Sequence, residues 1–184
     1  MRRKFGKIIS DLAKKDDKIF LIVGDIGFGI FDDFRKNHPK RFLNLGICEQ
    51  SIIGVASGMA LSGLKPWVYT ITPFLIERPF EQVKLDIDQQ NVNVNLVGFA
   101  DYPNLGPTHS ELDGKKLSKL FKNIVSYFPK NGEETEEVVL KSYAYYGLDC
   151  FSKFDGMFAI AIWDAKNSKL ILARDRFGEK PLFY

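Results

Sequence analysis

Four residues whose side chains could do chemistry follow short apolar runs of the sequence: Asp25, Glu49, Phe74 and His109. Carboxylates and imidazoles exchange protons in catalysis, and a large aromatic ring offers a surface on which a flat ligand can stack. Each residue also has an ordinary structural explanation, because acids favour the first turn of a helix, phenylalanines fill cores and a single histidine is commonly structural. Their chemistry is therefore informative only if the fold brings them together.

Short apolar runs alternate with segments of helical periodicity, and this alternation predicts the elements that position the four residues. The predicted strands are Ile19–Val23, Phe42–Leu45, Pro66–Ile71, Val92–Phe99 and Ile124–Phe128. The predicted helices are residues 4–15, 49–61, 80–87, 112–121 and 133–146. Strands that alternate with helices form parallel sheets, whose carboxyl ends share the edge where ligands of α/β folds bind. We therefore expect an α/β fold that gathers the four residues at one edge of a parallel sheet.

The composition excludes several classes of protein. Among 184 residues, 45% are hydrophobic and 27% charged, with a net charge of +3. These values exclude a disordered chain and favour one domain, or one domain with a fragment of another. The longest apolar run, Met157–Trp163, is far shorter than the ~20 residues of a membrane helix, and the interspersed charges form no basic stripe for nucleic acid. Cys48 and Cys150 give no disulfide or zinc pattern. We predict a cytoplasmic protein that binds neither nucleic acid nor membrane.

Four blocks of sequence occur in an order typical of one enzyme family: RFLNLGICEQ at residues 41–50, GMAL at 58–61, TITPFLIERPFEQ at 70–82 and GPTHSE at 106–111. With these blocks, residues 1 to about 146 resemble the pyrimidine-binding domain of transketolase-like thiamine diphosphate enzymes, and most of all the separate C-terminal subunit of split transketolases. The resemblance implies a three-layer α/β fold around the parallel sheet. It also implies transfer of a two-carbon ketol unit between sugar phosphates.

The resemblance assigns roles to five residues of this chain. Glu49 matches the glutamate that hydrogen-bonds N1′ of the cofactor's aminopyrimidine ring and favours its imino tautomer, after which the cofactor forms its own carbon nucleophile. Phe74 matches the aromatic residue that stacks on this ring, and His109 matches a histidine near the oxygen atoms of the substrate. Arg78 and Asp25 match further active-site positions, which we expect to contact the cofactor.

The resemblance extends to only half of such a site. The family holds the diphosphate and Mg²⁺ in a second domain through a Gly-Asp-Gly motif, and no such motif occurs in this sequence. The stretch Gly24–Gly29 around Asp25 is neither that motif nor a GxGxxG loop for dinucleotides. The resemblance thus implies that thiamine diphosphate binds between this chain and a diphosphate-binding transketolase subunit, which holds the Mg²⁺, in a dimer or heterotetramer. No residue of this chain is predicted to bind a metal.

The sequence pattern changes near Gly147. Residues 157–164 and 169–173 predict a β-hairpin, and a third strand begins at Leu182. The stretches 154–164 and 172–184 resemble part of the glutamine amidotransferase domain of asparagine synthetase. That family uses an N-terminal cysteine as its nucleophile, whereas this chain begins Met1-Arg2. For this segment the resemblance therefore implies scaffold rather than catalysis.

We interpret the sequence as a chimera of a pyrimidine-binding domain, residues 1–146, and a truncated amidotransferase-like β-hairpin segment, residues 147–184, with a join that could lie up to a helix earlier. One apolar face of the hairpin would then need cover; we expect it to comprise Phe158, Ile160, Ile162, Leu170 and Leu172. Three functions remain open: a transketolase-like transferase acting with its partner, a fragment of a glutamine-hydrolysing asparagine synthetase, and a catalytically inactive remnant.

Overall fold

The computed structural model describes residues 1–138, 159–164 and 169–174. The chain divides into two units, Met1–Leu140 and Lys141–Tyr184, and each is described by itself. This division and the predicted boundary near residue 146 fall in a segment outside the described residues, so the predicted domain limits stay a prediction.

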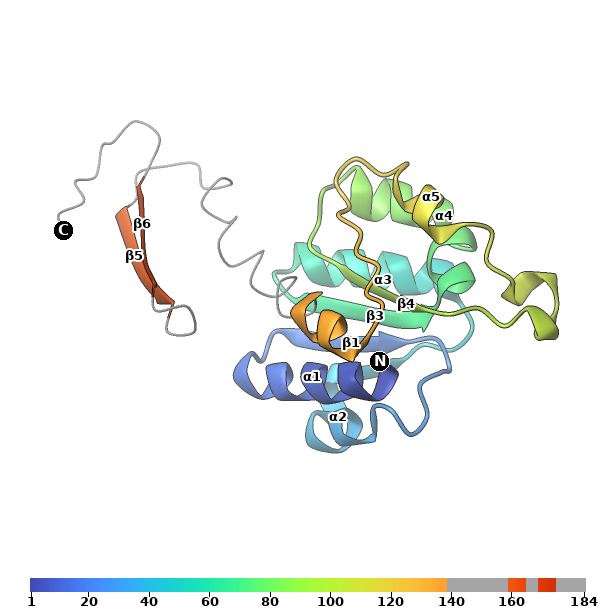
Figure 1. Cartoon of the computed structure of the whole chain (residues 1–184), viewed down its shortest axis with the longest axis horizontal. Helices are drawn as coiled ribbons and strands as arrows, with labels where there is room; N and C mark the ends of the chain where they lie inside the picture. The colour runs from blue at the N-terminus through green and yellow to red at the C-terminus, as the bar shows by residue number, and fades with distance from the viewer. Residues whose placement is uncertain (139–158, 165–168, 175–184) are drawn as a thin grey trace. The chain divides into compact units, whose positions relative to one another are not determined.

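The first unit is built around a four-stranded parallel sheet (Figure 1). Its strands are β1 (Ile19–Val23), β2 (Phe42–Asn44), β3 (Lys65–Ile71) and β4 (Asn95–Phe99), in the order β2-β1-β3-β4. The two central strands are buried along most of their length, which explains why they read as continuous apolar runs rather than alternating ones. The predicted α/β fold with a parallel sheet is confirmed.

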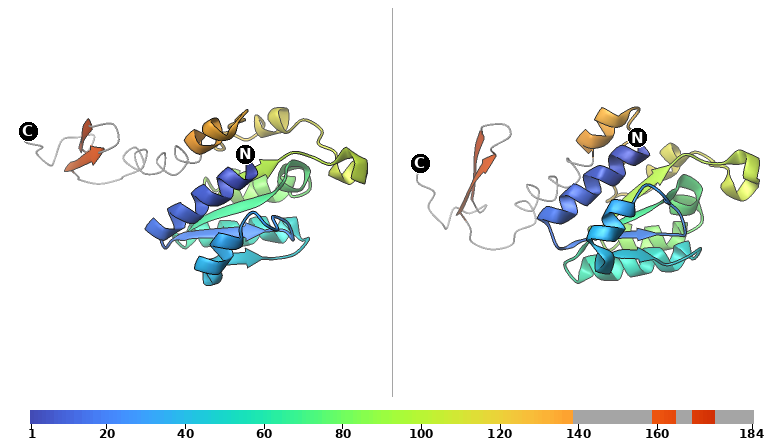
Figure 2. Two further views of the ribbon diagram at one scale, coloured as in Figure 1. Left: turned by 60° about the horizontal axis from the view of Figure 1, so that its bottom comes forward. Right: turned by 90° about the horizontal axis from the view of Figure 1, so that it is seen from below.

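Helices cover both faces of this sheet (Figure 2). Helix α1 (Arg2–Lys15) lies on one face, and α3 (Glu49–Leu61) lies on the other. The remaining helical segments are shorter: α2 (Asp32–Asn37), α4 (Phe80–Gln82), α5 (Gly114–Ser118), the π-helices Pro73–Glu77 and Val83–Asp88, and the 3-10 turns Pro39–Arg41, Pro103–Leu105 and Pro107–His109. The predicted three-layer arrangement is thus present in the described residues.

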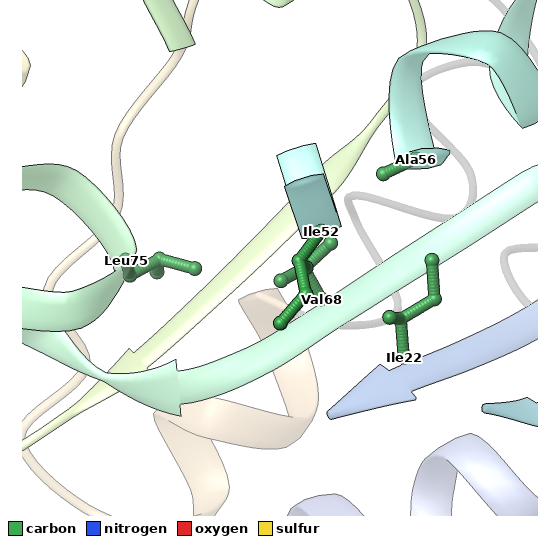
Figure 3. Packing of buried hydrophobic residues seen from close by; sticks show 5 residues of the cluster. All are labelled: Ile22, Ile52, Ala56, Val68 and Leu75. Carbon is green, nitrogen blue, oxygen red and sulfur yellow. The ribbon is translucent and has the colours of Figure 1, made fainter. Parts of the chain in front are cut away.

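Each face of the sheet has its own core, because successive residues of a strand point to opposite faces. On the α1 side, Phe5 stacks on Tyr69 with ring centroids 5.6 Å apart. On the α3 side, the preceding residue along β3, Val68, packs in a buried cluster that includes Ile52 from α3 (Figure 3). Burying each such aliphatic side chain contributes about 1.5–3 kcal/mol, so α3 is held firmly against the sheet.

Two expectations for residues 112–128 are wrong. The helix expected over residues 112–121 is the short α5, with Asp113 at its N-cap, and Ile124–Phe128 form no strand. A clip fixes the start of this segment beside the second π-helix: the Asn123 backbone N–H donates to Asp88 Oδ1 at 2.6 Å, and the Asn123 side chain donates to the Asp88 carbonyl at 2.7 Å. Since Asp88 lies outside the sheet, the clip explains why a run of strand-forming residues joins no ladder.

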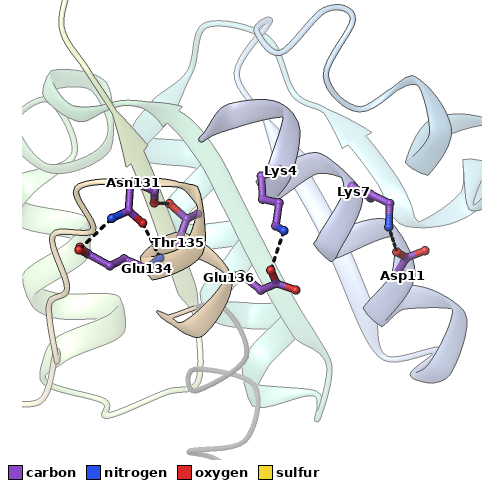
Figure 4. A network of polar contacts seen from close by, with 7 residues as sticks. All are labelled: Lys4, Lys7, Asp11, Asn131, Glu134, Thr135 and Glu136. Atoms are coloured by element: carbon purple, nitrogen blue, oxygen red, sulfur yellow. Dashed lines mark hydrogen bonds and ion pairs between the residues drawn. The ribbon is translucent and has the colours of Figure 1, made fainter.

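The predicted helix from residue 133 is seen over residues 132–138; its remainder lies outside the described residues. Asn131 caps it, because its Oδ1 accepts from the Glu134 backbone N–H at 2.8 Å while its Nδ2 donates to Glu134 Oε1 at 3.1 Å, which is a reciprocal capping arrangement. An ion pair of 2.7 Å between Lys4 and Glu136 ties this helix to α1 (Figure 4).

The second unit contains the predicted antiparallel hairpin, formed by β5 (Ala159–Asp164) and β6 (Lys169–Arg174). Its register corrects the expected apolar face. Ile160 and Ile162 pair with Ala173 and Ile171, whereas Leu170 and Leu172 pair with Trp163 and Ala161. Because directly opposed residues share a face, the two isoleucines and the two leucines lie on opposite faces. Phe158 and the predicted strand from residue 182 lie outside the described residues.

Candidate active site

The carboxyl ends of the parallel strands meet at one edge of the sheet, as expected (Figure 1). Backbone hydrogen bonds fasten these ends together: the Leu45 N–H donates to the Val23 carbonyl at 3.1 Å, and the Thr72 N–H donates to the Ala100 carbonyl at 3.2 Å. The loops that leave this edge therefore start from fixed positions, and they carry the candidate residues.

Glu49 is the first residue of α3 and is only 4% exposed. A carboxylate at a helix N-terminus is stabilised by the helix dipole, but burial of a charge still requires a partner. Ile52 and Ile53 anchor the same helix in the core, so the position of the carboxylate is set by packing and not by a mobile loop. Glu49 is thus held rigidly at the edge of the sheet.

Arg78 is the partner of Glu49. Its Nη1 donates to Glu49 Oε1 at 2.8 Å, across 29 residues of sequence. Arg78 follows the π-helix Pro73–Glu77, and its backbone N–H donates to the Pro73 carbonyl at 3.0 Å. Short π-helical turns shift side chains relative to a regular helix and are frequent at functional sites. Here the turn brings Arg78 to α3.

Phe74 lies between Arg78 and His109. The Arg78 guanidinium carbon is 3.7 Å from the centroid of the Phe74 ring, which is a close cation–π contact. The His109 ring meets Phe74 edge-on, with centroids 4.9 Å apart. His109 ends a 3-10 turn that begins after Gly106, whose φ of 104° favours glycine, and its carbonyl accepts from the Tyr102 N–H at 2.8 Å.

Asp25 belongs to a separate network at the same edge. Its backbone N–H donates to Asn44 Oδ1 at 2.9 Å, and Asn44 Nδ2 donates to Asp25 Oδ1 at 3.2 Å. The Gly46 N–H also donates to Asn44 Oδ1, at 3.1 Å. Asn44 thus joins the ends of β1 and β2 and sets the loop that leads to Glu49. The sequence analysis assigned it no role, although its place at the end of a predicted strand was a usable signal.

The structure therefore joins four of the five predicted residues in one chain of contacts, Glu49–Arg78–Phe74–His109. The arrangement suits a flat ring that meets a carboxylate at its edge and an aromatic side chain on its face, because the planar guanidinium of Arg78 already makes both of these contacts. Within the described residues no group of three or more His, Cys, Asp or Glu side chains could hold a metal ion. The residues present fit the pyrimidine end of thiamine diphosphate.

Comparison with known proteins identifies the family. The family model for the transketolase pyrimidine-binding domain matches residues 1–148. The chain belongs to this family. A second model, for the glutamine amidotransferase domain, matches residues 121–184 and overlaps the first. It covers about a third of the chain, mostly outside the described residues.

Members of the transketolase family are similar to this chain over most of its length. One of the separately encoded subunits of apulose-4-phosphate transketolase from Actinobacillus succinogenes is 36% identical over 82% of this chain and 49% of that protein. The 1-deoxy-D-xylulose-5-phosphate synthase of Clostridium perfringens is 36% identical over 74% of this chain and 22% of that protein. A solved structure, a split-gene transketolase described as an inactive β4 tetramer, has a TM-score of 0.69 and 27% identity over 77% of this chain and 46% of that one.

The chain spans about half the length of the transketolase subunits that it matches. Thiamine diphosphate is the cofactor that this transketolase-family membership implies. In the part of the chain that the structure describes, no helix is long and apolar enough to span a bilayer.

Proposed function

We propose that this transketolase-family chain supplies the pyrimidine half of a thiamine diphosphate site to a partner that holds the diphosphate and Mg²⁺. The complex would transfer a ketol unit between sugar phosphates. The single observation that carries the proposal is the buried carboxylate of Glu49, held by α3 at the edge of the sheet beside the Phe74 ring. Similarity to separately encoded transketolase subunits supports the need for a partner.

In this proposal each residue has a distinct task. Thiamine diphosphate supplies the carbon nucleophile, and the protein supplies binding, orientation and a proton site. Glu49 shares a proton with the ring nitrogen N1′, which an amide could not do. Phe74 stacks on the pyrimidine ring, and His109, which borders Phe74, lies on the side from which the oxygen atoms of the sugar approach. Asp25 and Asn44 line the neighbouring part of the edge.

A reconstitution experiment tests this function. The full chain is used to capture subunits from a lysate of the source organism in the presence of thiamine diphosphate and Mg²⁺, and a captured subunit with a Gly-Asp-Gly motif is then assayed with it on sugar phosphates. Glu49→Gln should lower kcat at least about 100-fold, because general acid–base groups typically contribute 10²–10⁴-fold.

Glu81→Gln is the matched control, since Glu81 is exposed on α4 and lies outside the contact chain. It should leave turnover unchanged. Full activity of the Glu49→Gln pair would exclude the proposed role of Glu49. Failure of every diphosphate-binding subunit to associate would favour the inactive remnant.

A second candidate function concerns the C-terminal unit. The amidotransferase match over residues 121–184 and the antiparallel hairpin β5–β6 favour a fragment of a glutamine-hydrolysing domain. Release of glutamate from glutamine by the full chain tests it. Glutamate at the level of a variant lacking both Cys48 and Cys150 would leave the segment as scaffold only.

A further inference from the structure

Arg78 makes both of the contacts that the proposed function requires of the pyrimidine ring. It donates a hydrogen bond to Glu49 Oε1 at 2.8 Å and stacks its guanidinium on Phe74 at 3.7 Å from the ring centroid. A guanidinium is flat, delocalised and rich in N–H donors, so in shape and hydrogen bonding it resembles one edge of an aminopyrimidine. We infer that Arg78 occupies the place of the pyrimidine ring and acts as a latch that must open before the cofactor binds. The inference rests on the proposed function.

The exposure of the two partners shows which one can move. The Glu49 side chain is 5% exposed, whereas the Arg78 side chain is 35% exposed. Glu49 is fixed by α3, whose neighbouring residues lie in the core. Arg78 is held at its backbone by the π-helix but has a long, rotatable side chain that reaches solvent. An incoming ring can therefore displace the arginine, while the carboxylate stays in place to receive it.

The position of Phe74 strengthens the argument. Phe74 and Arg78 are four residues apart on one helical turn, which places them on the same side of it. Leu75, the next residue, points instead into the core cluster on the α3 face (Figure 3). Since His109 borders the Phe74 ring and Arg78 covers it, a stacking ligand must take the space that the guanidinium fills.

The latch also controls the proton. In the ion pair with Arg78, Glu49 is a carboxylate and has no proton to share with a ring nitrogen. Withdrawal of Arg78 removes the positive charge that favours this form. Opening of the latch thus frees the stacking surface and allows Glu49 to take part in proton sharing in the same movement.

The latch lowers the apparent affinity for the cofactor by the fraction of molecules in which it is open. Titration calorimetry on the full chain with thiamine diphosphate and Mg²⁺, and separately with free thiamine, measures this effect. Arg78→Ala should bind both ligands about 10-fold more tightly than the unaltered chain, which corresponds to about 1.4 kcal/mol. Arg78→Lys should lie between the two, because an ammonium pairs with Glu49 but does not stack as a flat group.

Arg35→Ala is the matched control, because Arg35 also pairs with an acid, Asp32, but at 3.9 Å on the surface; its affinity should equal that of the unaltered chain. Free thiamine isolates the pyrimidine half, since it lacks the diphosphate that the partner holds. If Arg78→Ala does not fold, the Arg78→Lys result alone decides, with a gain of at least about threefold expected.

Equal or weaker binding by the Arg78 variants, with measurable binding by the unaltered chain, would overturn the latch and leave the proposed function intact. Arg78 would then be a cofactor-binding residue, as the sequence resemblance implies. No binding by any variant, with or without a captured partner, would overturn both proposals.

Discussion

The ion pair between Glu49 and Arg78 predicts an asymmetric response to removal of either charge. Arg78→Met keeps much of the aliphatic stem but leaves the Glu49 carboxylate, 5% exposed, without its partner. Glu49→Gln leaves an amide oxygen that still accepts from Arg78, whose side chain is 35% exposed and can reach water. The first variant should therefore destabilise the fold more than the second.

The magnitude follows from the burial of each partner. Breaking a fully buried pair by removing one partner costs about 3–5 kcal/mol, and the partly exposed arginine reduces this to about 2 kcal/mol for Arg78→Met. An exposed pair contributes about 0–1 kcal/mol, so Glu49→Gln should cost under about 1 kcal/mol. For a chain of this size each kcal/mol shifts Tm by about 2–4 °C.

Urea unfolding followed by tryptophan fluorescence measures both values. The sequence has two tryptophans, so the series is made in a Trp163→Phe background, in which Trp67, buried on β3, reports on the first unit alone. A double-mutant cycle then gives the coupling of the pair directly. A loss of stability for Glu49→Gln equal to or larger than that for Arg78→Met would refute the reasoning from burial.

Three further outcomes are expected. Phe74→Ala should weaken thiamine diphosphate binding by about 0.5–1.5 kcal/mol through lost stacking, and unchanged affinity in calorimetry would remove Phe74 from the site. Ile52→Ala should cost about 2–5 kcal/mol in urea unfolding, whereas Val55→Ala, on the exposed side of the same helix and 40% exposed, should cost well under about 1 kcal/mol. Burial and the nearby Arg41 guanidinium lower the pKa of His38, whose Nδ1 lies 2.7 Å from Arg41 Nη2. Protons then bind the unfolded chain first, so stability should be full above pH ~6.5 and fall below it; His38→Gln should flatten this slope in urea titrations between about pH 5 and 7.

Local signals in the sequence were sufficient for most of the sheet. Apolar runs bounded by Gly24 and Gly46 predicted β1 and β2 to within a residue, because a strand buried on both faces needs an unbroken apolar run. The edge on which the candidate residues meet followed from the parallel alternation alone. Asn44 shows the limit of such reasoning, since its part in joining two strand ends depends on the side-chain amide and not on the strand pattern.

Pairing partners could not be read from local signals. Ile124–Phe128 have the composition of a strand but join no ladder, since Asn123 is clipped to Asp88 away from the sheet. The apolar face of the hairpin β5–β6 was predicted wrongly, because a shift of register by one residue exchanges the faces of an entire strand. Composition gives no information about that shift.

The sequence by itself determined the fold class, the edge of the sheet and the identity of Glu49, Phe74 and His109 as candidates. These depend on periodicity and on the end of each apolar run, which are properties of neighbouring residues. Only the tertiary structure decided that Arg78, 29 residues from Glu49 along the chain, lies against both Glu49 and Phe74. Contacts between distant residues depend on how α3 and the π-helix pack on the sheet, and this packing is set by the summed burial of many side chains.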